Sequence, residues 1–207
     1  MSLASRERAA LCDLLVEVGP DAPTLCEGWD TRDLAAHLHL RETSPLAAGI
    51  VVKPLSGLMG RRQHEMASGD WARLVGRVRT PPRWSPSSIP AVDARMNASE
   101  YFVHHEDVRR AQPGWAPREL SASDERALWA LLRTAGKQFY RNATVPVVLR
   151  RPDGAELVMK PGHPAVIVSG PVGELVMHAF GRSDHALVEL EGPSDLVARF
   201  AETPLVV

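Results

Sequence analysis

The chain has 207 residues, of which 44% are hydrophobic and 24% charged, and its formal net charge is −1. A chain of this length can bury a core without disulfides, and this composition excludes disordered, collagen-like and transmembrane proteins. The near-zero charge gives no indication of nucleic acid or an anionic membrane as a partner. Only two cysteines are present, and the first residues lack a signal-peptide core, so we predict a cytoplasmic protein.

Prolines divide the first two thirds of the chain into segments of helix length. Because proline interrupts helix interiors, each proline-free window predicts a helix. Asp30 is placed to cap a helix that begins at Thr31, with Leu34 and Leu38 on one face. A helical bundle over residues 1–142 is the economical packing of these segments. The proline-free windows are 1–19, 24–44, 55–80, 91–112 and 118–145.

The last third of the chain has the character of a small mixed domain, which we place at residues 143–207. Short runs rich in β-branched residues, separated by turn residues, predict strands there. The fold class that we predict for the whole chain is therefore α+β. In chain order, we expect strands over 145–151, 155–160 and 165–170, a helix over 170–182, a strand over 186–192 and a helix over 193–200.

Two residues of the fourth window are spaced to bind one metal ion. Glu100 and His104 lie four residues apart, which places them about 40° apart on one helix face. Asp107, one turn later, can hydrogen-bond a ligand histidine, whereas His105 points elsewhere. The best-placed third ligand is His37, on the helix that Asp30 caps. Two imidazoles and one carboxylate leave open positions on a divalent ion, which is typical of a catalytic zinc site.

The spacing alone is a weak signal, because Glu174 and His178 repeat it on a later helix. Such a pair is more often a solvated or hydrogen-bonded surface feature than a ligand pair. His163 and His185 are interpreted as surface residues and His64 as part of a charged helix face. Cys26 is interpreted as packing, not as a nucleophile.

Three segments in the same order resemble a known family. TLCEGWDTRDLAAHL (24–38) resembles the signature Thr-x-Cys-x-Gly-Trp-x-x-x-Asp-Leu-x-x-His-Leu of mycothiol-dependent maleylpyruvate isomerase-like, metal-binding proteins of the DinB/YfiT-like four-helix-bundle superfamily. ASEYFVHHEDVRRA (98–111) resembles their Glu-x-x-x-His-x-x-Asp-x-x-Arg segment, and SGPVGELVMHAFGR (169–182) resembles a helix of their sterol-carrier-like C-terminal domain.

The resemblance implies site residues position by position. His37, Glu100 and His104 match the metal ligands, and Asp107 matches an aspartate beside them. Arg182 matches an arginine that helps to bind or polarise the substrate, and it is our candidate catalytic residue. The resemblance does not identify residues that bind an organic cofactor.

The function implied is metal-dependent thiol chemistry, with mycothiol as the thiol and an isomerase or thiol transferase as the enzyme. Zinc is the first expectation for the metal, with nickel and iron as alternatives. A small-molecule substrate or a thiol cofactor is the expected partner, and the expected assembly is a monomer or homodimer. The alternative is a non-catalytic protein with a structural or regulatory metal, whose C-terminal domain binds a small apolar ligand. A bundle without any metal is a third interpretation.

Overall fold

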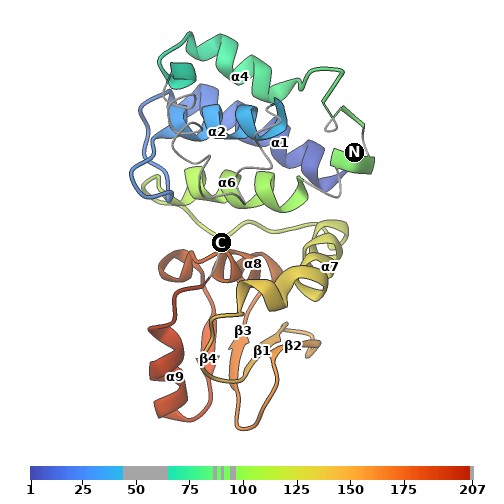
Figure 1. Ribbon diagram of the computed structural model, residues 1–207, viewed down its shortest axis with the longest axis vertical. Coiled ribbons are helices and arrows are strands. Elements are labelled where there is room, and N and C mark those ends of the chain that lie inside the picture. The colour runs from blue at the N-terminus through green and yellow to red at the C-terminus, as the bar shows by residue number, and fades with distance from the viewer. Residues whose placement is uncertain (44–64, 86–87, 90, 94–96, 206–207) are drawn as a thin grey trace. The chain divides into compact units, whose positions relative to one another are not determined.

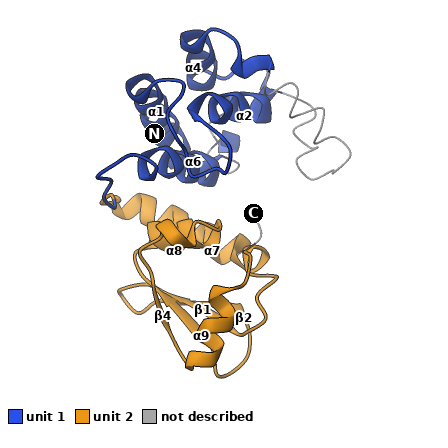
Figure 2. Ribbon diagram, turned by 90° about the vertical axis from the view of Figure 1, so that its left-hand side faces the viewer, with its two compact units in different colours: residues 1–117 blue, residues 118–207 orange. Residues whose placement is uncertain are grey.

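The computed structural model describes residues 1–43, 65–85, 88–89, 91–93 and 97–205. The chain divides into two compact units, Met1–Pro117 and Arg118–Val207 (Figure 2). The first unit is helical and the second contains the sheet, so the α+β class is confirmed (Figure 1). None of the helices that the structure describes is both long and apolar enough to cross a membrane.

The first unit is built from helices that begin where the sequence supplies caps. The Ser2 side chain accepts a hydrogen bond from the Ser5 amide, and Asp30 Oδ1 accepts one from the Asp33 amide at 2.9 Å. These bonds satisfy amides that have no partner within the first turn of a helix. The main helices of this unit are α1 (Leu3–Val18), α2 (Thr31–Thr43), α4 (Trp71–Arg79) and α6 (Ala98–Arg110). The beginning of the 55–80 window, including His64, lies outside the described residues.

An apolar core and a buried ion-pair network hold α2 and α6 in place. Leu34 and Leu38 of α2 are buried in the core, as predicted. Arg8 of α1 donates two hydrogen bonds of 2.7 Å to Glu42 of α2 and one of 2.5 Å to Asp93. A buried charge is tolerated only when it is paired in this way, so the network specifies how these segments meet. Tyr101 of α6 joins the network because its hydroxyl donates to Glu42 Oε1 at 3.0 Å, so the network positions both helices that carry the predicted metal ligands.

The second unit packs helices on a four-stranded mixed sheet with the strand order β2-β1-β3-β4. The β1–β2 and β3–β4 pairs are antiparallel, and the central β1–β3 pair is parallel. Each strand and helix predicted after residue 145 is present, with shorter bounds except for the last helix, which is shifted by one residue. In chain order the elements are α7 (Ala122–Phe139), β1 (Val147–Arg150), β2 (Glu156–Lys160), β3 (Val166–Ser169), α8 (Val172–Ala179), the 3-10 turn η4 (Ser183–His185), β4 (Glu189–Glu191) and α9 (Ser194–Ala201).

Helix α7 belongs to the second unit, whereas the sequence places it at the end of the bundle. The division of the chain falls before α7 at residues 117/118, and the predicted boundary at 142/143 falls after it. Leu128 and Leu132 are buried on its apolar face, and α7 packs on α8 and β2. A Cβ atom at Gly136 would lie 2.5 Å from Met159 Sδ of β2. This close approach commits α7 to the sheet of the second unit.

Candidate metal centre

The three predicted ligands lie together in the first unit. Glu100 and His104 occupy successive turns of α6, and Glu100 Oε2 lies 3.6 Å from His104 Nε2. His37 comes from α2, and the centroid of its ring lies 5.5 Å from that of His104. One ligand atom from each residue falls within 4.8 Å of the other two. This spacing can be spanned by a single divalent ion, whose bonds to nitrogen and oxygen are about 2.0–2.2 Å for zinc.

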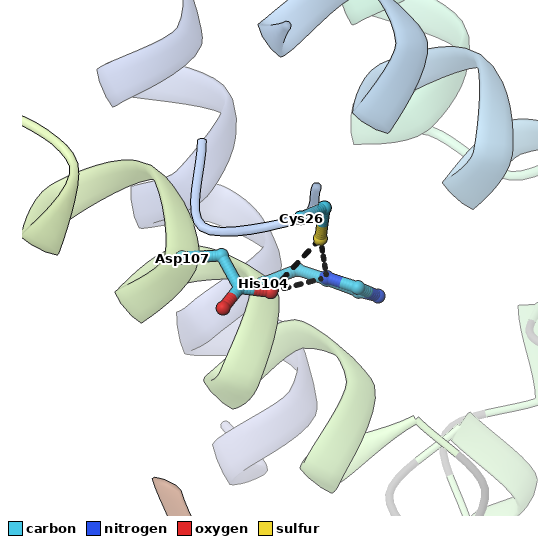
Figure 3. A group of neighbouring side chains, drawn as sticks. All are labelled: Cys26, His104 and Asp107. Carbon is cyan, nitrogen blue, oxygen red and sulfur yellow. Dashed lines mark hydrogen bonds and ion pairs between the residues drawn. The ribbon is translucent and has the colours of Figure 1, made fainter. Parts of the chain in front are cut away.

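The other nitrogen of His104 is held by Asp107. His104 Nδ1 donates to Asp107 Oδ2 at 2.9 Å, and the carboxylate of Asp107 is completely buried. Cys26 Sγ donates to the same oxygen at 3.3 Å (Figure 3). A ligand histidine characteristically gives its second N–H to a carboxylate, which fixes the ring and the tautomer. This leaves His104 Nε2, on the side of Glu100, available to bind a metal.

Cys26 reaches Asp107 from a loop with its own hydrogen bonds. The Thr24 hydroxyl accepts from the Cys26 amide at 3.1 Å and donates to the Trp29 carbonyl at 2.8 Å. The Leu25 amide donates to the carbonyl of Asp107 at 3.1 Å, which ties the loop to α6. The interpretation of Cys26 as packing therefore missed a polar contact with the carboxylate beside the candidate metal ligand.

A second group of potential ligands shares His104. Cys26, His104 and Asp107 also have ligand atoms within 4.8 Å of one another, on the Nδ1 side of the ring (Figure 3). In that group Nδ1 and the carboxylate already form a hydrogen bond of normal length. On the Nε2 side the contact with Glu100 Oε2 is longer, at 3.6 Å, so the His37, Glu100 and His104 group is the better candidate.

The protonation states of His37 and Glu100 suit metal binding. Burial opposes the charged form of His104, but its hydrogen bonds to Asp107, Cys26 and Glu100 raise its pKa above the usual value, so a metal must displace the Nε2 proton of this ring. Burial, followed by the charge of His104, lowers the pKa of His37 to about 4, so this imidazole is neutral at pH 7. Burial opposes ionisation of Glu100, but the hydrogen bond from His104 and the charge of Arg41 outweigh it and lower the pKa of Glu100 to about 2. Neutral imidazole and ionised carboxylate are the forms that coordinate metals.

Arg41 contacts the carboxylate of Glu100. Its Nε lies 3.3 Å from Glu100 Oε2, and its Nη1 donates to Asn97 Oδ1 at 2.6 Å. Both partners lie at or before the first turn of α6, so Arg41 of α2 also links the two helices of the site. The guanidinium keeps the carboxylate ionised when no cation is bound.

The remaining histidines have other partners. His105 points away from the group, as predicted, and its Nδ1 lies 2.7 Å from Glu7 Oε2 of α1. His178 is buried in the second unit, where Glu174 accepts from the Leu187 amide instead of facing it. His163 is exposed, as expected, whereas His185 is partly buried.

Arg182 follows α8 in the second unit. Gly181 has a φ of 78°, and the Arg182 amide donates to the Met177 carbonyl at 3.0 Å, so the chain turns there as the sequence predicts. The guanidinium donates to the carbonyl of Phe180 at 2.6 Å. This contact satisfies a carbonyl at the helix end, and the role in substrate binding stays a prediction.

Two solved structures are similar to this chain over most of its length. A histidine-to-alanine mutant of the mycothiol-dependent maleylpyruvate isomerase aligns with a TM-score of 0.60 and 18% identity, covering 91% of this chain and 90% of the other. The unmutated isomerase aligns with a TM-score of 0.56 and 21% identity over the same shares. The chain has the fold of this isomerase. No protein-family model and no curated protein sequence matches it.

Proposed function

We propose that the chain is a metal-dependent enzyme that uses mycothiol to isomerise, or to transfer a thiol to, a small electrophilic substrate. The observation that carries this proposal is that His37 of α2 and Glu100 and His104 of α6 bring one ligand atom each within 4.8 Å of the other two. The fold of a mycothiol-dependent isomerase supports it. Zinc is the first candidate for the ion, because its common ligands include imidazole and carboxylate.

The residues fit a metal that keeps a position open for a small molecule. Three protein ligands are typical of catalytic zinc sites, whereas structural sites have four. A divalent ion at such a site supplies a deprotonated, nucleophilic sulfur when a thiol coordinates it, which is the chemistry that reversible addition to an unsaturated carbon requires.

The protein's own residues would prepare this chemistry in three ways. His37 presents a neutral nitrogen, because burial keeps its pKa near 4. Asp107 holds the His104 ring by its Nδ1–H, which strengthens Nε2 as a donor to the metal. Glu100 contributes one negative charge, so that the ion retains net positive charge with which to stabilise a thiolate.

We also propose that Arg182 binds a carboxylate of the substrate. The proposal rests on the sequence resemblance, and its chemistry is the two-point contact that a planar guanidinium makes with a carboxylate. Arg182→Lys keeps the charge but loses this geometry. We expect the variant to lose turnover while its metal content stays equal to wild type; loss of metal would instead show that Arg182 has a structural role.

The test combines metal analysis with binding and turnover. Purified wild-type protein should contain one equivalent of divalent metal, bind mycothiol in calorimetry, and convert maleylpyruvate only when mycothiol is added. His104→Ala should abolish all three properties. His105→Gln is the matched control, because glutamine can still donate to Glu7 and the residue lies outside the ligand group.

The outcomes separate the candidate functions. Metal without mycothiol binding or turnover would contradict the enzyme and favour the non-catalytic alternative, with a structural ion. A protein that binds no divalent metal when reconstituted would contradict both of these functions.

A further inference from the structure

The second unit contains a cavity that is separate from the metal ligands. Its volume is about 240 Å³, and its walls come from α8, η4, β4, α9 and the segment after α9. Figure 1 labels α8, β4 and α9 of this group. Val188, Leu190 and Phe200 provide apolar surface, and the hydroxyl-bearing residues Ser183 and Thr203 also line it. Apolar and polar surface contribute about equally to the lining, so the cavity offers both packing for a small molecule and polar groups that can fix its orientation.

A buried histidine forms part of the cavity wall. His178 of α8 lines the cavity and is only 4% exposed. Its ring packs against two aromatic rings that also contact each other, with centroids 5.9 Å from Tyr140 and 5.7 Å from Phe200. Its Nδ1 lies 2.9 Å from the hydroxyl oxygen of Tyr140. The ring is therefore held by two aromatic neighbours and by a hydrogen bond on one nitrogen.

The hydrogen bond determines which nitrogen carries the proton. Within the described part of the chain, the side chains of Tyr140 and His178 have no other hydrogen-bond partner than each other. Burial raises the pKa of Tyr140 and lowers the pKa of His178 to about 4, so both groups are neutral at pH 7. The hydroxyl proton of Tyr140 then has one acceptor, His178 Nδ1. A neutral imidazole that accepts at Nδ1 carries its proton at Nε2.

The Nε2–H of His178 has no protein acceptor among the described residues. Every side-chain nitrogen or oxygen there that is fully sealed from solvent has a hydrogen-bond partner. His178 Nε2 is therefore not sealed, and the open space that the residue lines is the cavity. A donor on a ring that its neighbours hold in place thus faces a cavity of mixed apolar and polar lining, where a ligand that accepts its hydrogen bond is favoured.

The rest of the wall favours a neutral ligand. Glu174 accepts from the Leu187 amide at 2.8 Å, so its carboxylate holds the segment between η4 and β4 instead of entering the cavity. Asp184 is the charged residue among the described lining residues, and it is exposed. A carboxylate at that place repels anions, and the neutral imidazole does not attract them.

We propose that this cavity binds a small, neutral molecule with an apolar body and a hydrogen-bond-accepting oxygen, such as a ketone, and that His178 Nε2–H donates to that oxygen. The apolar body of the ligand packs on Val188, Leu190 and Phe200. The site is independent of the metal centre in the first unit.

Three probes of nearly equal shape test the ligand class on the full-length protein. Acetophenone has a carbonyl acceptor, α-methylstyrene replaces that oxygen with carbon, and benzoate carries a negative charge. Binding is measured at millimolar concentrations from the methyl signals of Val188 and Leu190 in NMR spectra. We expect saturable shifts with the two neutral probes and weaker ones with benzoate. The proposal would be overturned if neither neutral probe gave saturable shifts, or if benzoate bound more tightly than both.

The hydrogen bond is tested by comparing two proteins, because acetophenone and α-methylstyrene differ in hydrophobicity. The Tyr140→Phe/His178→Phe double variant removes donor and acceptor together and keeps the stacked rings, which avoids leaving one of them unpaired. The ratio of the acetophenone affinity to the α-methylstyrene affinity should be about threefold to tenfold higher in wild type than in this variant. An unchanged ratio contradicts the role of His178.

Further measurements locate the site and do not depend on that variant. In wild type, acetophenone should shift the ¹⁵N signal of His178 Nε2, and a constant signal at saturation counts against the hydrogen bond. Ala186→Leu fills the cavity and should abolish binding of both neutral probes, whereas Ala122→Leu on the exposed start of α7 should not. His104→Ala should leave probe binding unchanged, because the metal centre has no part in it.

Discussion

Two buried histidines, one in each unit, follow a glutamate by four residues on a helix, and their environments differ completely. On α6, Glu100 faces His104 at 3.6 Å. On α8, Glu174 turns to the Leu187 amide, and His178 is left without a carboxylate. Equal spacing therefore places two side chains on one face of a helix, but the neighbouring chain decides whether they meet.

The partner of Nδ1 sets the charge of each ring. Burial disfavours the cation in both cases, but the hydrogen bonds to Asp107, Cys26 and Glu100 keep the pKa of His104 above its usual range. His178 has a neutral phenol as its partner, and burial lowers its pKa to about 4. The same residue type thus has a raised pKa beside carboxylates in one unit and a lowered pKa beside a neutral phenol in the other.

The largest effect that separates the two histidines is expected in metal affinity. His104→Ala should weaken metal binding by about a thousandfold, if the roughly 10–16 kcal/mol typical of a structural zinc site is shared among its ligands. His178→Ala should leave metal affinity unchanged. Competition with a chromophoric chelator measures both. Equal loss in the two variants would mean that the metal centre is not at His104.

The second effect is a pH dependence of stability in the second unit. The pKa of His178 is about 4 in the folded chain, below the ordinary value of 6.5 that it regains on unfolding, so the unfolded chain binds the proton more readily. The stability from neutral His178 is present above pH 6.5 and is lost as the pH falls towards 4. The loss amounts to at most about 3 kcal/mol.

Urea unfolding followed by the buried methyl groups of Leu149 and Val168 reports on this unit alone. The Tyr140→Phe/His178→Phe variant lacks the titrating group, so its free energy of unfolding should fall less than that of wild type over the same pH range. Parallel curves for the two proteins would show that His178 is not the group responsible.

The fold was predictable where local sequence decides the structure. Prolines and caps such as Asp30 predict the helices, and β-branched runs predict the strands. The assignment of α7 was not predictable in this way, because its partners are distant in sequence. Gly136 contacts Met159 only in the folded second unit. The apolar face of a helix can be recognised in the sequence, but the sequence pattern does not indicate which unit that face packs against.

The candidate site shows the same division between local and tertiary information. Helix periodicity places Glu100 and His104 together and turns His105 away, as found. The approach of His37 depends on how α2 is positioned beside α6; the sequence indicated His37 as the best-placed third ligand, and the resemblance supported that choice. The contact of Cys26 with Asp107 depends on a hydrogen-bonded loop, for which the sequence carries no periodic signal.

A smaller effect on metal affinity should come from Asp107, which touches the ligand and not the metal in our assignment. Asp107→Asn can still accept from His104 Nδ1 but loses the negative charge. We expect metal binding about tenfold to a hundredfold weaker, with one equivalent still bound at saturation. Asp33→Asn, on the first turn of α2, is the matched control and should have no effect. A loss as large as that of His104→Ala would make Asp107 a ligand.

The smallest effect is expected at Cys26, and it decides between the two groups that share His104. If Cys26 only donates to Asp107, Cys26→Ser keeps a donor in place, and metal affinity should stay within about twofold of wild type. Cys26→Ala removes the donor, and a few-fold loss is expected, because a thiol is a weak donor and its bond contributes little. If Cys26, His104 and Asp107 bind the ion instead, both substitutions remove a thiolate ligand and should cost as much as His104→Ala. In that case His37→Ala would retain the metal, because His37 lies outside the Cys26 group.

Cobalt substitution distinguishes the same two ligand groups spectroscopically. A thiolate ligand adds an intense sulfur-to-metal charge-transfer band in the near ultraviolet. Our assignment predicts that this band is absent until a thiol cofactor is added.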